Sequence, residues 1–287
     1  MSEIGIMQVT KRQIQSVLKR AGIYQRLKAS SVYDLYWTLY NRRIINDRNK
    51  EIDFYRSLLT GFQRGNLVFD VGANAGDKTD VFLRMGARVV AVEPDERSQE
   101  VLRGKFLDCR LVPKPVVIVG RAVSETVGVQ TMWVDGPGSA LNTLSQKWAE
   151  SPKEDRKHCE HATDVVEFAQ KKSIETTTLQ QLIIMHGLPF FVKIDVEGHE
   201  LSVLRGLRCP VPYLSFEVNL PEFRKEGLQC LELLGGLAAG RFNYASDCKS
   251  GLIFDRWVDQ QQCSQMLENC PERCIEIFWR TALASNE

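Results

Sequence analysis

Residues 66–80 read NLVFDVGANAGDKTD, and this stretch decides the fold. An apolar run ends around Asp70, and small residues then interrupt the chain before a helix can begin. Gly72 and Gly76 let the backbone turn sharply and come close to a ligand. The stretch therefore predicts a buried strand, a loop that binds a ligand, and a helix.

Beyond this stretch, short β-branched runs alternate with helical patterns. Strands are predicted at 67–71, 88–93, 115–119, 190–196, 213–218, 241–245 and 274–279. Helices are predicted at 77–85, 95–106, 179–186, 200–206 and 221–237. Strands joined by helices imply crossover connections and a parallel sheet covered on both faces. The fold class is therefore α/β.

In such a sheet the ligand lies beyond the carboxyl ends of the strands, and two ligand classes use a glycine loop there. A dinucleotide favours G-x-G-x-x-G spacing, which is absent, and Asp70 would repel its diphosphate. S-adenosylmethionine (SAM) carries an amino group and a sulfonium, both positive, so a carboxylate attracts it. We expect Asp70, Gly72, Ala73, Asn74 and Gly76 to bind SAM. The alternative for Asp70 is a structural acid at a turn.

A second acid supports this interpretation. Glu93 ends the next predicted strand, 21 residues after Gly72. This is about the separation at which an acid reaches a ribose diol in dinucleotide folds, and the same geometry serves adenosine. Glu93 is therefore predicted to bind the ribose of SAM.

A later stretch, FVKIDVEGHELSVLRGL at 191–207, narrows the assignment. With DVGAN, SIETTTLQQLI and YLSFEVN, it resembles the FkbM-like family of SAM-dependent methyltransferases over roughly residues 52–245. The resemblance implies a Rossmann-like seven-stranded sheet whose last strand runs antiparallel. It also implies methyl transfer to a hydroxyl oxygen of a sugar or other small metabolite. Many SAM enzymes carry an acid for the adenine after the third strand, but residues 120–124 read GRAVS, so the backbone or Ser124 is expected to hold adenine.

Methyl transfer to an alcohol requires a base that takes the proton or a metal that acidifies the hydroxyl. Asp195, at the tip of the fourth predicted strand, is expected to face the methyl group. Lys193 lies on the same strand face by the period of two. His199 is the other candidate base, because its ordinary pKa lies near neutrality. An exposed histidine at a helix start is the alternative for His199.

Further polar residues at the strand tips are predicted to bind the acceptor, namely Glu197, Glu217 and Asn219. Glu197 or Glu200 can instead serve only as a helix cap, because acids favour helix N-termini. Asp195, Glu217 and Asn219 also form an oxygen-rich set that suits Mg²⁺. We favour the route without a metal and keep Mg²⁺ as the second option.

Two parts of the chain lie outside this pattern. Residues 1–60 are predicted to form an N-terminal helical extension, with two or three helices within 8–60, before a methyltransferase domain at 61–287. Within that domain, 124–134 resemble a strand or hairpin arm, and 135–164 are an insertion rich in glycine, proline and charge. Long loops in compact domains often serve function, so 135–164 are predicted to form a lid over the acceptor.

Charge gives a weaker indication of partners. The chain has a formal net charge of +1, so no whole-molecule field favours nucleic acid. Residues 1–50 nevertheless carry ten Lys and Arg against three acids. This segment is either a solvated helical face or a surface for a membrane, a nucleic acid or a phosphate-bearing partner.

Two other functions are considered beside the small-molecule methyltransferase. One is a nucleic-acid or protein methyltransferase guided by the basic segment, and the other is a SAM-binding module without catalysis. The Asp/Asn-Pro-Pro-aromatic motif of base-amino methylation is absent, which disfavours the nucleic-acid reading.

Cysteine usage bears on the compartment. The eight cysteines show no paired CxxC spacing, and neither His158–His161 nor the pair Cys270 and Cys274 matches a four-ligand zinc pattern. The start lacks a signal-peptide pattern, and no apolar run approaches the roughly 18 residues of a membrane span. A cytoplasmic protein with free thiols and no structural metal is expected.

Overall fold

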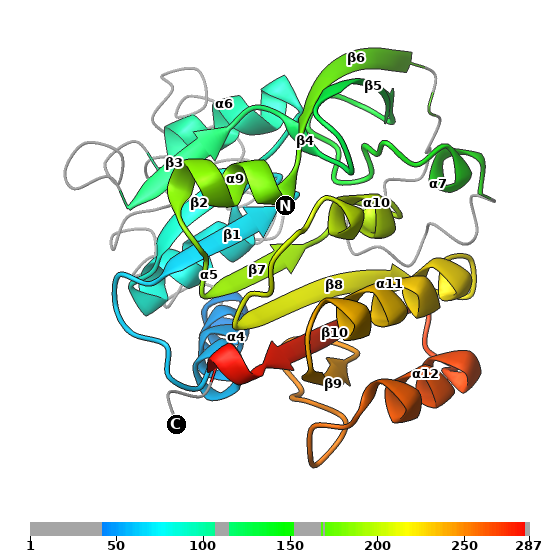
Figure 1. Cartoon of the computed structure of the whole chain (residues 1–287). Helices are drawn as coiled ribbons and strands as arrows, with labels where there is room; N and C mark the ends of the chain where they lie inside the picture. Colours follow the sequence, from blue (N-terminus) through cyan, green and yellow to red (C-terminus); the bar gives the residue numbers. More distant parts are fainter. Residues whose placement is uncertain (1–41, 107–114, 152–167, 169, 285–287) are drawn as a thin grey trace, which may run out of the picture.

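The computed structural model describes residues 42–106, 115–151, 168 and 170–284 (Figure 1). A seven-stranded sheet lies at its centre, in the order β3-β2-β1-β7-β8-β10-β9. The strands are β1 (Leu67–Val71), β2 (Arg88–Val92), β3 (Val116–Val119), β7 (Phe191–Ile194), β8 (Tyr213–Asn219), β9 (Gly240–Ala245) and β10 (Cys274–Thr281). The last strand, β10, runs antiparallel to β8 and β9, and the other neighbours pair in parallel. The predicted Rossmann-like α/β fold with an antiparallel last strand is confirmed.

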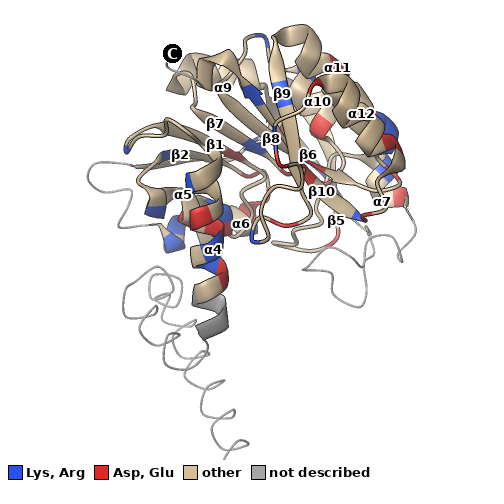
Figure 2. Cartoon of the chain, turned by 90° about the horizontal axis from the view of Figure 1, so that it is seen from below, with Lys and Arg blue, Asp and Glu red and all other residues tan. Residues whose placement is uncertain are grey.

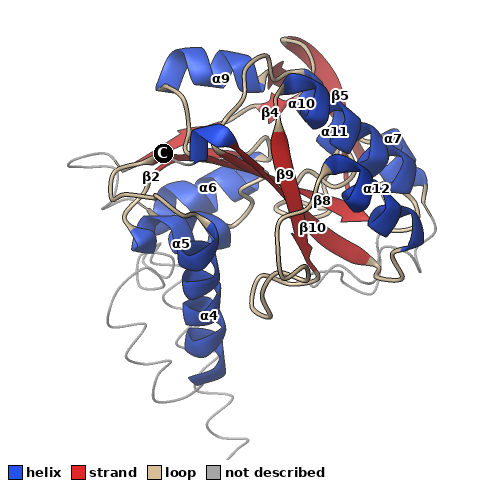
Figure 3. Cartoon of the chain, turned by 60° about the horizontal axis from the view of Figure 1, so that its bottom comes forward, coloured by secondary structure: helices blue, strands red, loops and turns tan. Residues whose placement is uncertain are grey.

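Helices cover both faces of this sheet (Figure 3). On one face lie α4 (Arg42–Leu58), α5 (Asp77–Met85) and α6 (Glu96–Lys105). On the other lie α9 (Leu179–His186), α10 (Glu200–Arg205), α11 (Arg224–Leu237) and α12 (Gln260–Asn269). Every residue of β1 is buried, because a central strand of a sheet covered on both faces has no solvent side.

The alternation of side chains along β1 divides the core into two clusters. Val68 packs with Tyr55 of α4 and Phe82 of α5. Phe69 faces the opposite way and packs with Leu182 of α9 and other side chains of that face. Burial of such side chains is worth about 1.5–3 kcal/mol each, which holds both helical layers on the sheet.

A second, three-stranded sheet is formed by strands that lie between β3 and β7 in the chain, in the order β4-β6-β5. It contains β4 (Ala122–Val123), β5 (Gly128–Val134) and β6 (Gln170–Thr177). The strand expected within 124–134 is confirmed as β5, whereas β6 and α12 were not predicted. Each element buries few of its side chains, so its sequence is mostly polar and shows no clear apolar pattern. The sequences are QKKSIETT for β6 and QQQCSQMLEN for α12.

Several predictions fall on residues outside those the structure describes. Of the helices expected within 8–60, α4 is described and carries charges of both signs (Figure 2), while residues 1–41 with most of the basic segment are not. The insertion at 135–164 is described up to residue 151 and contains the short helix α7 (Gln146–Glu150). The 158–161 stretch lies outside as well. The division into a 1–60 extension and a 61–287 domain stays a prediction.

The described residues bear on the cysteines and on membrane-spanning helices. Six cysteines are free thiols: Cys209, Cys230, Cys248, Cys263, Cys270 and Cys274. Among the described helices, none combines the length and the apolar character that crossing a membrane demands.

Candidate active site

The candidate site forms where the exit loops of β1 and β7 meet. These strands are neighbours at the centre of the sheet, and the strands that follow them in the chain lie outward on opposite sides, β2 and β3 beyond β1 and β8 beyond β7. Gly72 has a φ of 86°, and a Cβ on it would overlap the carbonyl oxygen of Asp195. Only glycine therefore allows the two loops to touch. Each loop also holds a non-glycine residue at positive φ, Asn74 at 42° and Glu197 at 53°, a conformation that clusters at functional sites.

A cavity of about 50 Å³ opens beside this contact. Of the residues predicted to bind the cofactor, Gly72, Asn74 and Glu93 line it. His199 lines it too, and its further lining residues are Val71, Val92, Pro94, Arg121, Ala122, Val123, Ser139, Ala140, Asn142, Thr143, Leu144 and Val196. The volume of this cavity is smaller than the roughly 300–1,000 Å³ of typical ligand sites. The segment 139–144 forms one of its walls.

Glu93 lies at the end of β2 with both carboxylate oxygens fixed. The Asn74 N–H donates to Oε2 and the Asp95 N–H to Oε1, each at 2.8 Å. Burial raises the pKa of Glu93 to about 7, although these two hydrogen bonds oppose the shift. Each carboxylate oxygen of Glu93 accepts one backbone N–H and can still accept a second hydrogen bond. The two oxygens can therefore accept the two hydroxyls of a vicinal diol.

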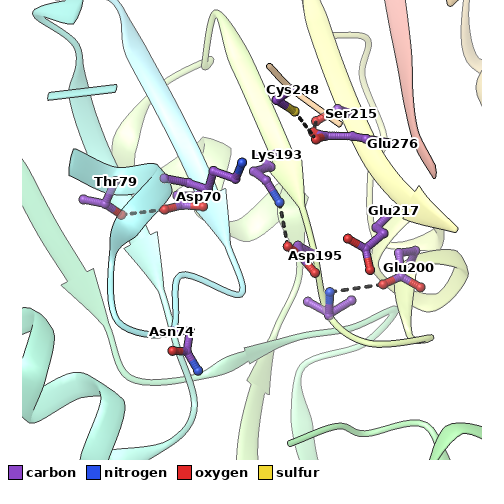
Figure 4. Close-up of polar contacts among 12 residues, drawn as sticks. Asp70, Asn74, Thr79, Lys193, Asp195, Glu200, Ser215, Glu217, Cys248 and Glu276 are labelled. Carbon is purple, nitrogen blue, oxygen red and sulfur yellow. Dashed lines mark hydrogen bonds and ion pairs between the residues drawn. The ribbon is translucent and has the colours of Figure 1, made fainter. Parts of the chain in front are cut away.

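Asp70 is buried and does not line the cavity. The Thr79 hydroxyl donates to its Oδ2 at 2.5 Å, and Figure 4 shows the Lys193 side chain on the same side of the sheet. Burial raises the pKa of Asp70, and the charge of Lys193 and the Thr79 hydrogen bond oppose that shift. Its described partners are therefore protein groups, and contact with the amino group of SAM stays a prediction.

Ala73 and Gly76, the other loop residues predicted to bind the cofactor, have packing neighbours in the described structure, and their contact with SAM stays a prediction. Ala73 belongs to the core cluster shared with α4 and α5. Gly76 has a φ of 76°, and a Cβ there would lie 2.6 Å from side-chain atoms of both Leu102 and Phe106. The expected reason for glycine at this position was a close approach to the ligand, but the described neighbours are side chains of and next to α6.

Three carboxylates gather on the β7 side of the site. Carboxylate oxygens of Asp195, Glu197 and Glu217 lie within 4.8 Å of one another. Burial and the charge of Asp195 raise the pKa of Glu217 to about 8. Burial and the charge of Glu217 raise the pKa of Glu197 well above its usual range. We call these three residues the acid cluster, and at neutral pH it holds protons that isolated carboxylates would release.

Asn219, predicted beside Glu217, orients this cluster. Its amide Nδ2 donates to Glu217 Oε1 at 3.2 Å. The expected set of oxygen ligands was Asp195, Glu217 and Asn219. In the structure Glu197, and not Asn219, is the third member of this group.

Lys193 supplies the positive charge next to the cluster. Its Nζ lies 2.8 Å from Asp195 Oδ2, and its side chain is almost fully buried (Figure 4). Burial would lower the pKa of Lys193, but Asp195, Glu276 and Asp70 hold that pKa well above its usual range. The period-of-two argument thus correctly brought Lys193 and Asp195 together.

Glu200 holds the loop that carries Glu197. Its Oε1 accepts from the N–H groups of Val196 and Gly198 at 3.1 and 3.2 Å. Burial raises the pKa of Glu200 to about 7. Of the two acids considered as caps, Glu200 has this structural role.

His199 is half-buried and contacts Ser124, which lies between β4 and β5. Its Nε2 lies 3.0 Å from the Ser124 hydroxyl, which also accepts from Gln130 Nε2 at 3.0 Å. Burial lowers the pKa of His199 to about 4, so the imidazole is neutral at pH 7. A histidine of such low pKa is a weaker proton acceptor than the acid cluster.

Sequence reasoning missed the contacts that join 135–145 to the site. Asp95 accepts from the Gly138 N–H at 2.9 Å while it also caps α6 through the Ser98 N–H. The Thr143 hydroxyl donates to the Glu197 carbonyl at 2.8 Å. The first part of the insertion therefore touches both the β2 exit and the acid cluster. An N-cap aspartate after β2 was a local signal for Asp95, but its second partner is 43 residues away.

The chemistry of the lining residues fits an adenosyl ligand. Glu93 offers oriented acceptors, and the backbone of the β1 loop approaches closely because of Gly72. Arg121, Ala122 and Val123 line the same cavity after β3, whereas Ser124 is occupied by His199 and Gln130. Of the two options for adenine, the backbone option is favoured.

Comparison with known proteins gives one family and several structures. The methyltransferase FkbM domain family matches residues 70–231, more than half of the chain. A methyltransferase FkbM from Methylobacillus flagellatus KT is 16% identical, with 78% of this chain and 46% of that chain covered and a TM-score of 0.46. This chain thus spans less than half the length of that protein.

Two further solved structures are similar at lower identity. A precorrin-6y C5,15-methyltransferase from Geobacter metallireducens GS-15 is 10% identical, covering 81% of this chain and 86% of that one, with a TM-score of 0.36. A SAM-dependent O-methyltransferase from Thermotoga maritima is 13% identical, covering 81% and 65%, with a TM-score of 0.36. The chain matches no curated protein.

Proposed function

Because the chain belongs to the FkbM family of methyltransferases, we propose that it transfers a methyl group from SAM to a hydroxyl oxygen of a sugar or other small metabolite. SAM supplies an activated methyl group on a sulfonium, which leaves as a neutral thioether when an oxygen–carbon bond forms. The chain must then hold the cofactor, align the hydroxyl and accept its proton.

The cofactor part of the proposal uses the cavity beside Gly72. Glu93 accepts hydrogen bonds from the ribose diol, and Asn74 keeps Glu93 in place through its backbone N–H. Asp70 adds negative charge behind the loop, which favours the cationic end of SAM. Entry of the adenosyl group requires 139–144 to move, since this wall leaves only about 50 Å³. This supports the predicted lid for the described part of 135–164.

The acid cluster accepts the proton of the acceptor hydroxyl. The backbone carbonyl of Asp195 contacts Gly72, which brings this member of the cluster next to the proposed cofactor loop. Glu197 and Glu217 are its neighbours, and interacting carboxylates titrate as a unit. Because their pKa values are raised, Glu197 and Glu217 hold protons near neutral pH, and Asp195, paired with the Lys193 ammonium, is the member that accepts the hydroxyl proton. Glu217 and Asn219 also remain candidates for hydrogen bonds to the acceptor's hydroxyls.

Lys193 acts as a positioning residue in this scheme. It is too buried to meet the acceptor, but its ion pair fixes the Asp195 carboxylate. In this proposal the acid cluster, and not His199, is the base. His199 lines the cavity in which the cofactor is proposed to bind.

A divalent ion such as Mg²⁺ is the second mechanism for the same site. Asp195, Glu197 and Glu217 would hold it, and oxygen ligands of this kind suit a hard cation. The ammonium of Lys193 already contributes one positive charge at Asp195, which favours the metal-free route.

The contact of Gly72 with Asp195 carries the proposal, because it joins a cofactor loop to a proton-accepting cluster. Incubation with methyl-labelled SAM and host extract tests it. Label in a small-molecule fraction, located on oxygen by mass and NMR analysis, is expected. Label in protein or nucleic acid would favour the rival substrates, and SAM binding without any transfer would favour a non-catalytic module.

A further inference from the structure

A second hollow lies on the β9 edge of the sheet, far from the acid cluster along the strands. It has a volume of about 540 Å³ and is lined by Arg241, Arg256, Trp257, Gln262 and Arg280. Arg241 is near the start of β9, and Arg280 is near the end of the antiparallel β10. The hollow therefore lies where the parallel strands begin, at the opposite end from the exit loops of β1 and β7 (Figure 1).

Two arginines in this hollow lie side by side on neighbouring strands of the sheet. Arg241 and Arg280 are direct partners in the β9–β10 ladder. Direct partners project from the same face, and like charges at such positions destabilise a sheet. Within the described part of the chain, neither these two nor Arg256 forms an ion pair with a carboxylate. Three guanidinium groups therefore lie close together. Their mutual repulsion is not offset by an ion pair with any acid of the described chain.

The walls of the hollow are held in place. The Arg280 guanidinium lies 4.7 Å from the centre of the Trp257 ring, a cation–π contact that fixes its plane. Val258 exchanges two backbone hydrogen bonds with Phe242 of β9, at 2.8 and 2.9 Å, which ties the segment of Arg256 and Trp257 to the sheet edge. The Arg280 guanidinium and the backbone that carries Arg256 and Trp257 are therefore positioned before any ligand arrives.

The nearest acids in sequence leave this charge uncompensated. Asp259 accepts from the Gln262 N–H at 2.9 Å as the N-cap of α12. Asp255 is exposed beside Arg256 and makes no ion pair with it in the structure described.

We propose that this hollow binds a phosphate group, with Arg241 and Arg280 holding its oxygens and Arg256 and Gln262 donating further hydrogen bonds. The planar fork of arginine matches the spacing of phosphate oxygens, and such charge-assisted bonds are about twice as strong as neutral ones. The phosphate belongs to a small metabolite or to a lipid headgroup, since both present the same oxygens. This proposal does not depend on the methyl-transfer proposal and can be tested separately.

Titration calorimetry and thermal melting with glycerol 3-phosphate test the site, with sodium chloride at matched ionic strength as the reference. The ester should bind and raise the melting temperature more than chloride does. Arg241→Gln and Arg280→Gln should each weaken binding about tenfold or more, as loss of a charge-assisted hydrogen bond predicts. Arg208→Gln, at an exposed arginine outside the hollow, is the control and should bind within about twofold of the parent, since it touches nothing there.

One further readout separates binding from structure. Without ester, Arg241→Gln should melt at the same temperature as the parent or higher, because a like-charge pair is removed. If Arg280→Gln does not fold, Arg256→Gln on the adjoining segment takes its place. Equal stabilisation by chloride, or full ester binding by the arginine variants, would overturn the proposal.

Vesicles of phosphatidylcholine with and without phosphatidic acid distinguish the two sources. Co-sedimentation with the acidic vesicles that the arginine variants lose, without binding of the free ester, assigns a lipid phosphate. Binding of the free ester alone assigns a metabolite. Binding to neither contradicts the site.

Discussion

Gly72 lies against the carbonyl oxygen of Asp195, so the loop after β1, proposed to bind SAM, and the loop after β7, proposed to carry the base, share one backbone contact. A substitution at Gly72 therefore disturbs both halves of the site at once.

Gly72→Ala should destabilise the protein and weaken SAM binding, because it adds both an unfavourable φ and an overlap. Gly65→Ala is the matched control, since Gly65 has a φ of 91° and open space around its would-be Cβ. The conformational strain alone costs about 1–3 kcal/mol. Urea unfolding should show a clearly larger loss for Gly72→Ala, and equal losses would mean that the loop contact has no energetic weight.

SAM affinity should fall as the pH drops through about 7. Glu93 has a pKa of about 7, and its ionised form is the better acceptor for a ribose diol. Calorimetry at pH 6 and pH 8 should therefore give tighter binding at pH 8. Glu93→Gln should bind more weakly at pH 8 and lose most of this dependence; an unchanged pH profile in the variant would assign the titration to another group.

Asp70→Ala should weaken SAM binding by about 1–3 kcal/mol, the cost of leaving a charged partner unpaired. Thr79→Val removes the hydroxyl that donates to Asp70 and keeps the carboxylate. If the carboxylate's charge is what matters, the valine variant retains most of the affinity. Parent-like affinity in Asp70→Ala would remove Asp70 from the cofactor site.

The strands and helices around the site could be predicted from periodicity, because β1, α5 and α9 have sharp apolar runs and clear ends. The strand β6 of the small sheet and the helix α12 could not, because their side chains are mostly polar and few of them are buried. The pairing of Lys193 with Asp195 followed from strand geometry alone. Long-range contacts such as Thr143 with Glu197 could not be predicted, since nothing local to either residue indicates its partner.

Folding stability should decrease as the pH rises from about 5 to about 8. The folded-state pKa values of Glu93, Glu200 and Glu217 are raised to about 7, 7 and 8, so the folded protein binds more protons than the unfolded chain in this range. Stability is then fully present below the ordinary glutamate pKa and is lost as each buried acid ionises.

Urea unfolding at pH 5.5 and pH 8 measures this effect in the parent and in Glu217→Gln. The variant should show a smaller loss, because one of the raised carboxyls is gone. Glu268→Gln, at an exposed glutamate, is the control and should behave like the parent. Stability that rises with pH would contradict the burial of these acids.

The most direct test of the central claim is single-turnover methyl transfer by the parent and by Asp195→Asn in excess chelator, with the acceptor found by label transfer. The parent should turn over fully, and the variant should lose about 10²–10⁴-fold in rate while its SAM affinity stays nearly unchanged, because a positioned base contributes that much. Near-parental rates in Asp195→Asn would contradict a carboxylate base at this position. Loss of the parent's activity in chelator, restored by Mg²⁺, would instead assign the acid cluster to a metal.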